Sequence, residues 1–390
     1  MRQVTIGMII GIIAGMIIGA TVIRPHVMPP TLKAGQAEPE PGEMAVTDAA
    51  RMPVEDPPAP ETPITPPEPE TVHWRMTSAY SGSLPVLGDL PKHLESAISR
   101  ISGGRFKMDF HEPGTLVPPQ ALFEAVRSGT IQAGFSSPAL SAEKIPALQL
   151  FSSVPFGPDA REMLAWFRQG GGQQIFDGIY DKQGIHSLVC GATSAEASGW
   201  FRKPITTLKD LNGLRMRISG LGARVMEKLG VSTEVLMNED IIVAVESGAI
   251  DAAEFSQPAE DFSLGLHRTT DVVYFPGWHQ PATLYDLMIN KEAWEALPDT
   301  AKAQIEAVCG DNIWRGLAAA DARQFATLKR LTELGIRMET WSPELLMAFR
   351  KAWGEVATEQ SEKDKDFKRT WNSIRKFREE FSIWHELSTP

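Results

Sequence analysis

The sequence lacks most motifs that carry catalysis or metal chemistry. It has two cysteines in 390 residues, Cys190 and Cys309, and no CxxC or cysteine–histidine spacing of a zinc or redox site. The patterns GxSxG, HExxH and HxE…CxxC are absent. No Lys-Ser/Thr follows the glycines at 170–172, so they form no phosphate loop. No basic stripe with interleaved aromatics indicates nucleic-acid binding. These absences argue against an enzyme and against a nucleic-acid partner.

Negative charge is concentrated in one segment. The formal net charge is −11, and the stretch from Ala34 to His73 holds nine acidic residues against one base, Arg51. Residues 25–72 also contain thirteen prolines and almost no large apolar side chains, a composition that cannot bury enough surface to fold. We therefore expect 25–72 to be a disordered Pro/Glu-rich linker.

An uncharged apolar run lies near the N-terminus. Val4 to Ile23 is 20 residues long, enough at about 1.5 Å per residue to cross about 30 Å of hydrocarbon. Glycines recur in it every four residues, which lets two membrane helices approach closely. A cleaved signal peptide is the alternative, although its apolar region is usually about 7–15 residues. Residues 1–24 are predicted to be a membrane anchor or a signal sequence, and both place the rest outside the cytoplasm. There, the two cysteines are free to form a disulfide, which a domain of this size does not need.

Residues 73–390 show the alternating periodicities of an α/β fold. HWRMTSAY and RFKMDFHEPG alternate as strands do, and Leu90–Ile101 has helical spacing with Asp89 as its N-cap. Further helices are predicted at 118–128, 222–229 and 240–247, separated by the strands GLRMRIS and STEVLM. The stretch VVYFPGWHQPATLYDLMINKEAWEALP is expected to be a loop, then a strand and the start of a helix, and the chain from Lys291 onward is expected to be nearly all helical. Alternating strands and helices predict mainly parallel sheets.

One phrase occurs twice in the chain. Residues 125–139 read AVRSGTIQAGFSSPA and residues 244–259 read AVESGAIDAAEFSQPA. Each copy looks like the end of a helix, a glycine with positive φ (Gly129 and Gly248) and a strand that runs out into small or polar residues. Ligands of open α/β sheets bind outside the carboxyl ends of strands. The repeat predicts two lobes facing one cleft, a first lobe at about 73–195, a second at about 196–285 and helices over about 286–390.

Several motifs resemble those of a known transport family. They are GWFRKPI (199–205), DLNGLRMRISGLG (210–222), VESGAIDAAEF (245–255) and PGWHQPATLYDLMINKEAWEALP (276–298). With SGGRFKMDFHEPGTLVPP and SSVPFG they resemble the substrate-binding proteins of TRAP transporters (tripartite ATP-independent periplasmic), closest to the subgroup that binds 2-oxo acids and similar monocarboxylates. The resemblance covers residues 74–390. It implies a two-lobed periplasmic binder with a long helix spanning both lobes, which delivers solute to membrane carrier subunits.

The resemblance assigns binding roles to specific residues. Arg217 lies on a predicted strand whose neighbours Met216 and Ile218 point into the core, and the matching arginine of the family clamps the substrate carboxylate. A guanidinium grips a carboxylate through two charge-assisted hydrogen bonds, a geometry that lysine cannot reproduce. Arg215 matches a more variable basic position and is interpreted as solvated. Trp200 and Trp278 are expected to wall the cleft, with packing at the hinge as the alternative.

The family's 2-oxo acid subgroup also implies a cation site. Its ligands match Glu196, Glu254, the main-chain carbonyl of Phe255 and Gln280, and hard cations such as sodium or, alternatively, calcium prefer such oxygen ligands. Relatives commonly carry Gln at 196 and Glu at 280, so this chain exchanges a carboxylate and an amide. Either the site is retained with its charge redistributed, or it drifted after the metal was lost. The same four residues, together with Arg217, Trp200 and Trp278, are the predicted substrate site.

The predicted function is therefore a periplasmic receptor for a small 2-oxo or 2-hydroxy monocarboxylate, with no organic cofactor. Relatives carry tyrosines where this chain reads SSPALSAEK, so the ligand is not assumed to be pyruvate. A carboxylate sensor acting through a signalling partner is the alternative. An enzyme using Glu196 and Glu254 as an acid/base pair would need a nucleophile that the sequence does not provide. The amphipathic stretch WNSIRKFREEFSIW predicts a homodimer through a C-terminal helix, with packing on its own subunit as the alternative.

Overall fold

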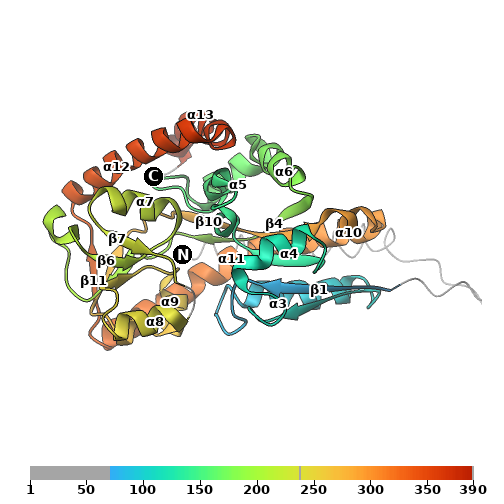
Figure 1. Cartoon of the computed structure of the whole chain (residues 1–390), viewed down its shortest axis with the longest axis horizontal. Helices are drawn as coiled ribbons and strands as arrows, with labels where there is room; N and C mark the ends of the chain where they lie inside the picture. The colour runs from blue at the N-terminus through green and yellow to red at the C-terminus, as the bar shows by residue number, and fades with distance from the viewer. Residues whose placement is uncertain (1–70, 237–238, 389–390) are drawn as a thin grey trace, which may run out of the picture. The chain divides into compact units, whose positions relative to one another are not determined.

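The computed structural model describes residues 71–236 and 239–388, which form two α/β lobes, each built around its own sheet (Figure 1). The apolar run and the proline-rich segment lie outside the described residues, so their predicted roles are not tested. Within the described ranges, none of the helices is both long and apolar enough to cross a bilayer.

The first sheet has five strands in the order β2-β1-β3-β10-β4. β1 (Val72–Ser78) pairs in parallel with β2 (Phe106–His111) and β3 (Ala133–Ser136). β10 (Ala282–Asn290) runs antiparallel to β3 and to β4 (Ile185–Ser194). The expectation of a mainly parallel sheet is thus wrong for its β10–β4 side. β4 leads out to the second lobe and β10 leads back, so the two strands run in opposite directions.

The helices of the first lobe confirm the predicted strand–helix alternation. The helix predicted at Leu90–Ile101 is α3 (Asp89–Ile101), but Gly88 occupies the N-cap position and Asp89 lies in the first turn, where a carboxylate is favourable. Gly171, with φ 87°, separates α5 from α6. The remaining helices are α4 (Leu122–Arg127), α5 (Ala160–Gln169), α6 (Gly172–Asp181) and the 3-10 turns η2 (Pro119–Ala121), η3 (Pro138–Ser141) and η4 (Pro146–Phe151).

The second sheet has six short strands in the order β11-β9-β5-β8-β6-β7. The segment expected to be a loop contains β9 (Val272–Phe275), which is buried because it pairs with both β5 and β11. That expectation was wrong because four apolar residues are too few to show a period. The other strands are β5 (Gly199–Phe201), β6 (Arg215–Arg217), β7 (Ser232–Glu234), β8 (Ala252–Ala253) and β11 (Arg337–Thr340).

The repeated phrase has the same structure in both lobes. Gly129 has φ 74° after α4 and Gly248 has φ 73° after α8, and each precedes a strand, β3 or β8. Both copies therefore direct a strand end towards the region between the sheets. The helices of the second lobe are α7 (Gly220–Lys228), α8 (Glu239–Glu246), α9 (Pro258–Leu264), η5 (Leu208–Leu211) and η6 (Leu266–Arg268).

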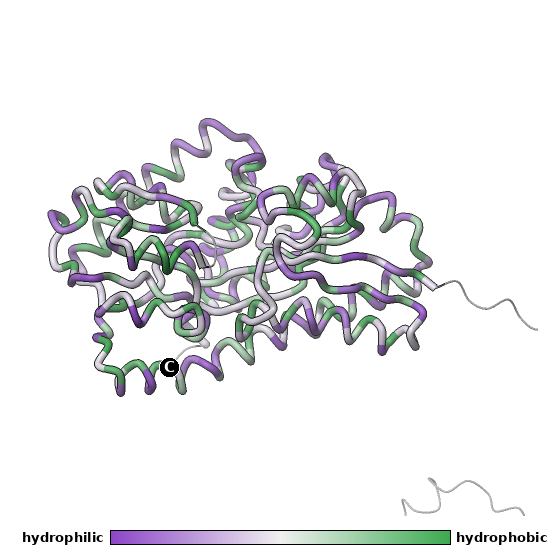
Figure 2. The backbone as a smooth tube through the Cα atoms, turned by 60° about the horizontal axis from the view of Figure 1, so that its bottom comes forward, coloured by the Kyte–Doolittle hydropathy of each residue, from purple (hydrophilic) through white to green (hydrophobic). Residues whose placement is uncertain are grey.

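Helices make up most of the C-terminal part, as predicted. These are α10 (Lys291–Glu295), α11 (Asp299–Glu333), α12 (Pro343–Lys363) and α13 (Lys365–Ser388). In Figure 1, α11 runs from α10 beneath β4 to the side of the second sheet. Figure 2 shows helices alternating between hydrophilic and hydrophobic residues, as expected where one helix face packs and the other meets solvent.

Helix α11 is held against β4 by three close contacts. The side chain of Asn312, fully buried, donates to the carbonyls of Cys190 (2.8 Å) and Leu90 (3.2 Å). Gly316 lies so close that a Cβ there would stand 2.5 Å from the carbonyl oxygen of Ala192. Cys190 and Cys309 form a disulfide. The long helix is therefore fixed to the first lobe.

We expect reduction of this disulfide to lower the stability of the protein. It closes a loop with a sequence separation of 119 residues, and a cross-link of that span contributes up to about 5 kcal/mol in the chain-entropy estimate. Urea unfolding of the wild type and of Cys309→Ser, each with and without reductant, measures the effect. Reductant should lower the midpoint of the wild type alone, and an equal midpoint in all four samples would contradict the expectation.

Candidate functional site

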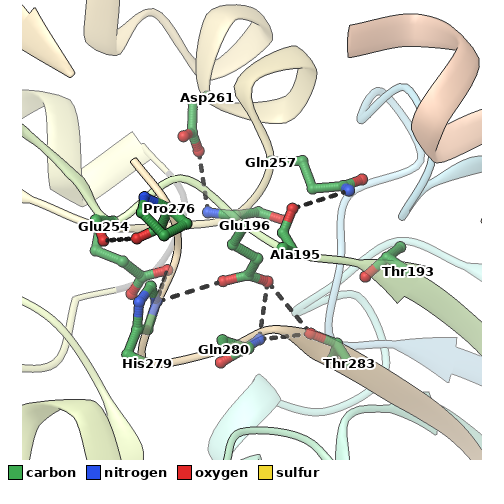
Figure 3. A network of polar contacts seen from close by, with 12 residues as sticks. Thr193, Ala195, Glu196, Glu254, Gln257, Asp261, Pro276, His279, Gln280 and Thr283 are labelled. Atoms are coloured by element: carbon green, nitrogen blue, oxygen red, sulfur yellow. Dashed lines mark hydrogen bonds and ion pairs between the residues drawn. The ribbon is translucent and has the colours of Figure 1, made fainter. Parts of the chain in front are cut away.

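Strand ends and chain crossings bring five polar side chains together between the lobes. Glu196 follows β4, Arg217 ends β6, Glu254 follows β8, and His279 and Gln280 precede β10. The two crossing segments lie side by side, with the backbone N–H of Glu196 donating to the carbonyl of Gln280 at 3.2 Å. Figure 3 shows His279 between the carboxylates of Glu196 and Glu254.

Arg217 is a buried cation with part of its guanidinium already engaged. Its side chain is 6% exposed, its Nε donates to the carbonyl of Leu236 at 3.0 Å, and its Nη1 donates to the carbonyl and to Oε2 (3.2 Å) of Glu254. The ring of Phe255 stands 5.6 Å from the guanidinium carbon. Among the described residues, no hydrogen bond from Nη2 is found. Arg215, two residues away, is 47% exposed and pairs with Asp251, as the sequence suggested.

Glu196 and Gln280 face one another, as the exchange of carboxylate and amide predicted. Gln280 Nε2 donates to Glu196 Oε1 at 2.8 Å and to Thr283 Oγ1 at 2.6 Å, and Thr283 donates to the same Glu196 oxygen at 3.4 Å. The second oxygen of Glu196, Oε2, is buried without a hydrogen-bond partner. One carboxylate oxygen is thus held in position while the other is left for a ligand.

His279 is the residue that sequence reasoning missed. Its Nε2 lies 3.7 Å from Glu196 Oε2 and 3.5 Å from Glu254 Oε1, and the side chain is 2% exposed. Both ring nitrogens lack a hydrogen bond. Its place in the motif PGWHQP, next to Gln280, was the available signal.

The cluster holds protons tightly. Burial raises the pKa of Glu196 to about 8. Burial alone would lower the pKa of His279, but its two carboxylate neighbours outweigh burial and raise it to about 9. Burial would likewise raise the pKa of Glu254, yet His279 and Arg217 outweigh it and the pKa lies below its usual value. The bound protons therefore offset the negative charge of two carboxylates that are buried close together.

The cluster has a donor set that fits a small cation. One ligand atom from each of Glu196, Glu254 and His279 lie within 4.8 Å of one another, and carboxylate oxygens are what sodium and calcium prefer. The unpartnered oxygen of Glu196 points to the same conclusion. The roles of the Phe255 carbonyl and of Gln280 as ligands stay predictions.

Both tryptophans predicted to wall the cleft are packed in the interior. Trp200 is fully buried and its indole donates to Asp261 at 2.7 Å. Trp278 is 3% exposed and stacks on Phe156 at 5.5 Å between ring centroids. These contacts match the alternative of packing at the hinge, and a direct role in binding stays a prediction.

The first lobe supplies aromatic rings from elements that sequence reasoning did not consider. Tyr80 follows β1, and burial and the nearby Glu196 carboxylate raise its pKa far above the usual value. Its ring contacts Tyr285 of β10 edge-on at 5.6 Å, and the Tyr285 hydroxyl lies 3.3 Å from Thr193 Oγ1. Tyrosines after β1 and in β10 therefore stand near the cluster, although the segment after β3 has none.

A groove lies elsewhere in the described part of the chain. It has a volume of about 1040 Å³ between the start of α5 and helices α12 and α13, and none of the five cluster residues lines it. The residues predicted from the sequence, Arg217, Glu196, Glu254 and Gln280, belong to the buried cluster and not to this open groove.

Gly277 sets the position of Glu196. A Cβ at residue 277 would stand 2.1 Å from the carbonyl oxygen of Glu196, so Gly277→Ala must displace the crossing segment. Overpacking of this kind costs about 1–3 kcal/mol, and we expect it to lower both stability and carboxylate affinity. Gly178→Ala, where a Cβ meets nothing within 4 Å, is the matched control. Equal melting temperatures and ligand shifts for both variants would contradict this expectation.

Comparisons with known proteins identify relatives over most of the chain. The profile of the family described as bacterial extracellular solute-binding protein, family 7, matches residues 77–364. The monocarboxylate 2-oxoacid-binding periplasmic protein of a Nostoc species is 34% identical over 317 residues, which are 81% of this chain and 87% of the relative.

Solved structures agree with this result. A TRAP transporter solute-binding protein of Bordetella bronchiseptica, a dimer with calcium and picolinate, is 36% identical with a TM-score of 0.80, covering 82% of this chain and 95% of that one. A TRAP periplasmic solute-binding protein of Pseudoalteromonas atlantica with bound sodium and pyruvate is 29% identical with a TM-score of 0.78, covering 82% and 97%.

Proposed function

Because the chain belongs to the family 7 bacterial extracellular solute-binding proteins, which are receptors rather than enzymes, we propose that it is the receptor of a TRAP-type transporter for a small monocarboxylate. The ligand class is a 2-oxo or 2-hydroxy acid, bound between the lobes and handed to the membrane carrier. The observation that carries the proposal is the buried Arg217 next to the Glu196–His279–Glu254 cluster.

The two halves of the site divide the work of recognition. Arg217 supplies the positive charge for the ligand carboxylate, whose oxygens compete with Glu254 Oε2 for the guanidinium. A cation held by Glu196 and Glu254 would attract an oxygen or nitrogen next to the carboxylate. Pyruvate and picolinate, which the two relatives bind together with sodium or calcium, both have such an atom. Since Arg217 and Glu196 are each at most 6% exposed, the ligand is small and enclosed.

We also propose that the receptor is tethered to the inner membrane through residues 1–24 and reaches the carrier on the linker 25–72. The 20-residue apolar run supports an anchor, and the linker composition supports a flexible span of roughly 40 Å as a coil. Mass spectrometry of the purified protein tests the anchor, since a mature chain beginning after residue 24 would identify a cleaved signal.

A homodimer through α13 is the proposed assembly. The last turns of this helix expose large apolar side chains, with Ile383 at 64%, Trp384 at 60% and Leu387 at 79%, and the relative from Bordetella bronchiseptica is a dimer. Exposed apolar clusters of this kind mark association surfaces. Light scattering of the full-length protein in detergent should give twice the mass found for Trp384→Glu, and equal masses would contradict a dimer through this helix.

A thermal-shift panel tests the ligand class. A ligand that binds the folded state alone raises the melting temperature by mass action, by about 2.7 kcal/mol of stability at 100 times its Kd. We expect shifts with 2-oxo and 2-hydroxy monocarboxylates that grow with sodium or calcium, and none with the matching primary alcohols. A shift with the alcohols alone would contradict the proposed class.

A further inference from the structure

Glu260 is a buried carboxylate that the ligand site does not use. It lies in the first turn of α9, is 1% exposed, and its Oε1 accepts a 2.9 Å hydrogen bond from the backbone N–H of Val86. Its other oxygen, Oε2, is buried with no hydrogen-bond partner. Val86 lies in the loop between β1 and α3 of the first lobe, whereas α9 belongs to the second. The bond therefore joins the two lobes.

The Val86 end of this bond is a fixed part of the first lobe. Leu84, Val86 and Leu87 are at most 5% exposed and pack in the same core as α3. The backbone N–H of Gly82 donates to Glu112 at 2.8 Å, and a Cβ at Gly88 would stand 2.5 Å from the Ser81 carbonyl. A loop wound this tightly carries the Val86 N–H along with the lobe.

The Glu260 end is fixed equally well to the second lobe. The neighbouring Asp261 is fully buried and accepts hydrogen bonds from Trp200 Nε1 at 2.7 Å and from the backbone N–H of Ser256 at 3.0 Å. Trp200 belongs to β5 of the second sheet. Helix α9 is thus tied to that sheet, and also to α11, where the backbone N–H of Ala259 donates to Gln324 at 3.0 Å. Separating α9 from the loop between β1 and α3 therefore has to break the Glu260–Val86 bond.

The two partners of this bond are also close in sequence to residues of the candidate site. The loop that carries Val86 contains Tyr80, and α9 begins three residues after Phe255. In Figure 1 this loop reaches from β1 towards α9. Both partners therefore follow directly on segments that supply the candidate site.

We propose that Glu260 is a latch, a positioning residue that bonds to the Val86 N–H only when the lobes are closed and so slows ligand release. This inference rests on the proposed receptor function. In an open protein both groups are solvated, whereas in the closed one they form a charge-assisted bond out of water, which favours the closed state. Glu260 does not touch the ligand, so its effect on affinity acts through the equilibrium between open and closed states.

Stopped-flow fluorescence of the full-length protein in detergent tests the latch, using its ten tryptophans as reporters and pyruvate in sodium buffer as the probe. Glu260→Ala should raise the dissociation rate about tenfold or more and leave the association rate within about twofold, since the closed state alone loses a bond. Glu260→Gln, which keeps an acceptor oxygen without the charge, should have a dissociation rate between those of the wild type and Glu260→Ala. Arg323→Gln, which breaks an exposed pair with Asp89 (2.7 Å) nearby, is the matched control and should release ligand at the wild-type rate.

Two results would overturn the latch. One is a dissociation rate of Glu260→Ala equal to that of Arg323→Gln. The other is a melting temperature of ligand-free Glu260→Ala and Glu260→Gln lowered as much as that of the ligand-bound form, which would mean that Glu260 only stabilises the fold. If the wild type binds no pyruvate, the proposed ligand class fails. The latch is then tested without ligand, by measuring the radius of gyration of the variants by small-angle scattering. There Glu260→Ala should have a larger radius of gyration than Arg323→Gln, and equal radii would refute it.

Discussion

Arg217→Ala is expected to abolish carboxylate binding, with Kd rising at least about 100-fold. A charge-assisted pair with a buried anion contributes about 1.5–3 kcal/mol, and its loss would also leave the ligand carboxylate without a positive partner in an enclosed site. The same change leaves Glu254 facing His279 alone, since Arg217 Nη1 now contacts Glu254 Oε2 at 3.2 Å. Isothermal titration with pyruvate and the best acid of the thermal-shift panel measures the effect.

Arg215→Ala is the matched control for this substitution. Arg215 lies on the same strand and carries the same charge, but it is 47% exposed and paired with Asp251. Its loss should change Kd by less than about threefold, since exposed pairs contribute about 0–1 kcal/mol. Equal losses in the two variants would show that strand β6 matters as a whole and that Arg217 is no specific clamp.

Cation binding should strengthen steeply as the pH rises from 6 to 9. The pKa of Glu196 is raised to about 8 by burial, and that of His279 to about 9 by its two carboxylate neighbours, which outweigh burial. A cation competes with these protons for the carboxylates. For each proton that must be released, the apparent affinity for the cation therefore rises roughly tenfold per pH unit. The thermal shift caused by calcium should therefore be small at pH 6 and large at pH 9.

The cation-free protein should show the opposite trend. Raised pKa values mean that the folded chain binds more protons than the unfolded chain, so this part of the stability is complete at low pH. The contribution of Glu196 is lost as the pH rises from about 4.5 to about 8, and the contribution of His279 is lost as the pH rises from about 6.5 to about 9. Glu196→Gln should flatten both trends. A calcium shift that is independent of pH in the wild type would contradict the assignment of the cluster as a cation site.

The sequence predicted which residues lie together at the candidate site better than it predicted the details of the fold. The resemblance assigned Arg217, Glu196, Glu254 and Gln280 to one site, and the structure brings these four side chains together between the lobes, while their binding roles stay predictions. The facing of Glu196 and Gln280 followed from their exchange of amide and carboxylate, and the structure joins them at 2.8 Å. Local patterns and the resemblance were sufficient here.

The features that the sequence did not predict depend on contacts between segments that are distant in the chain. His279 became visible as part of the site only when the crossing segment folded back against Glu196 and Glu254, because a single histidine beside a glutamine has no pattern of its own. Likewise, β9 was taken for a loop because its pairing partners β5 and β11 lie about 70 residues away on either side in the chain. The Glu260–Val86 bond spans 174 residues and had no local signal at all.

The most direct test of the account is isothermal titration of the full-length wild type with pyruvate and related 2-oxo acids, in sodium buffer and in a buffer whose only cation is choline. We predict one ligand per chain for at least one 2-oxo acid, with affinity that falls when sodium is withdrawn and is restored by calcium. Binding of equal affinity in both buffers would contradict a cation-assisted site. No heat with any 2-oxo acid, from a protein that unfolds cooperatively, would contradict the carboxylate receptor itself.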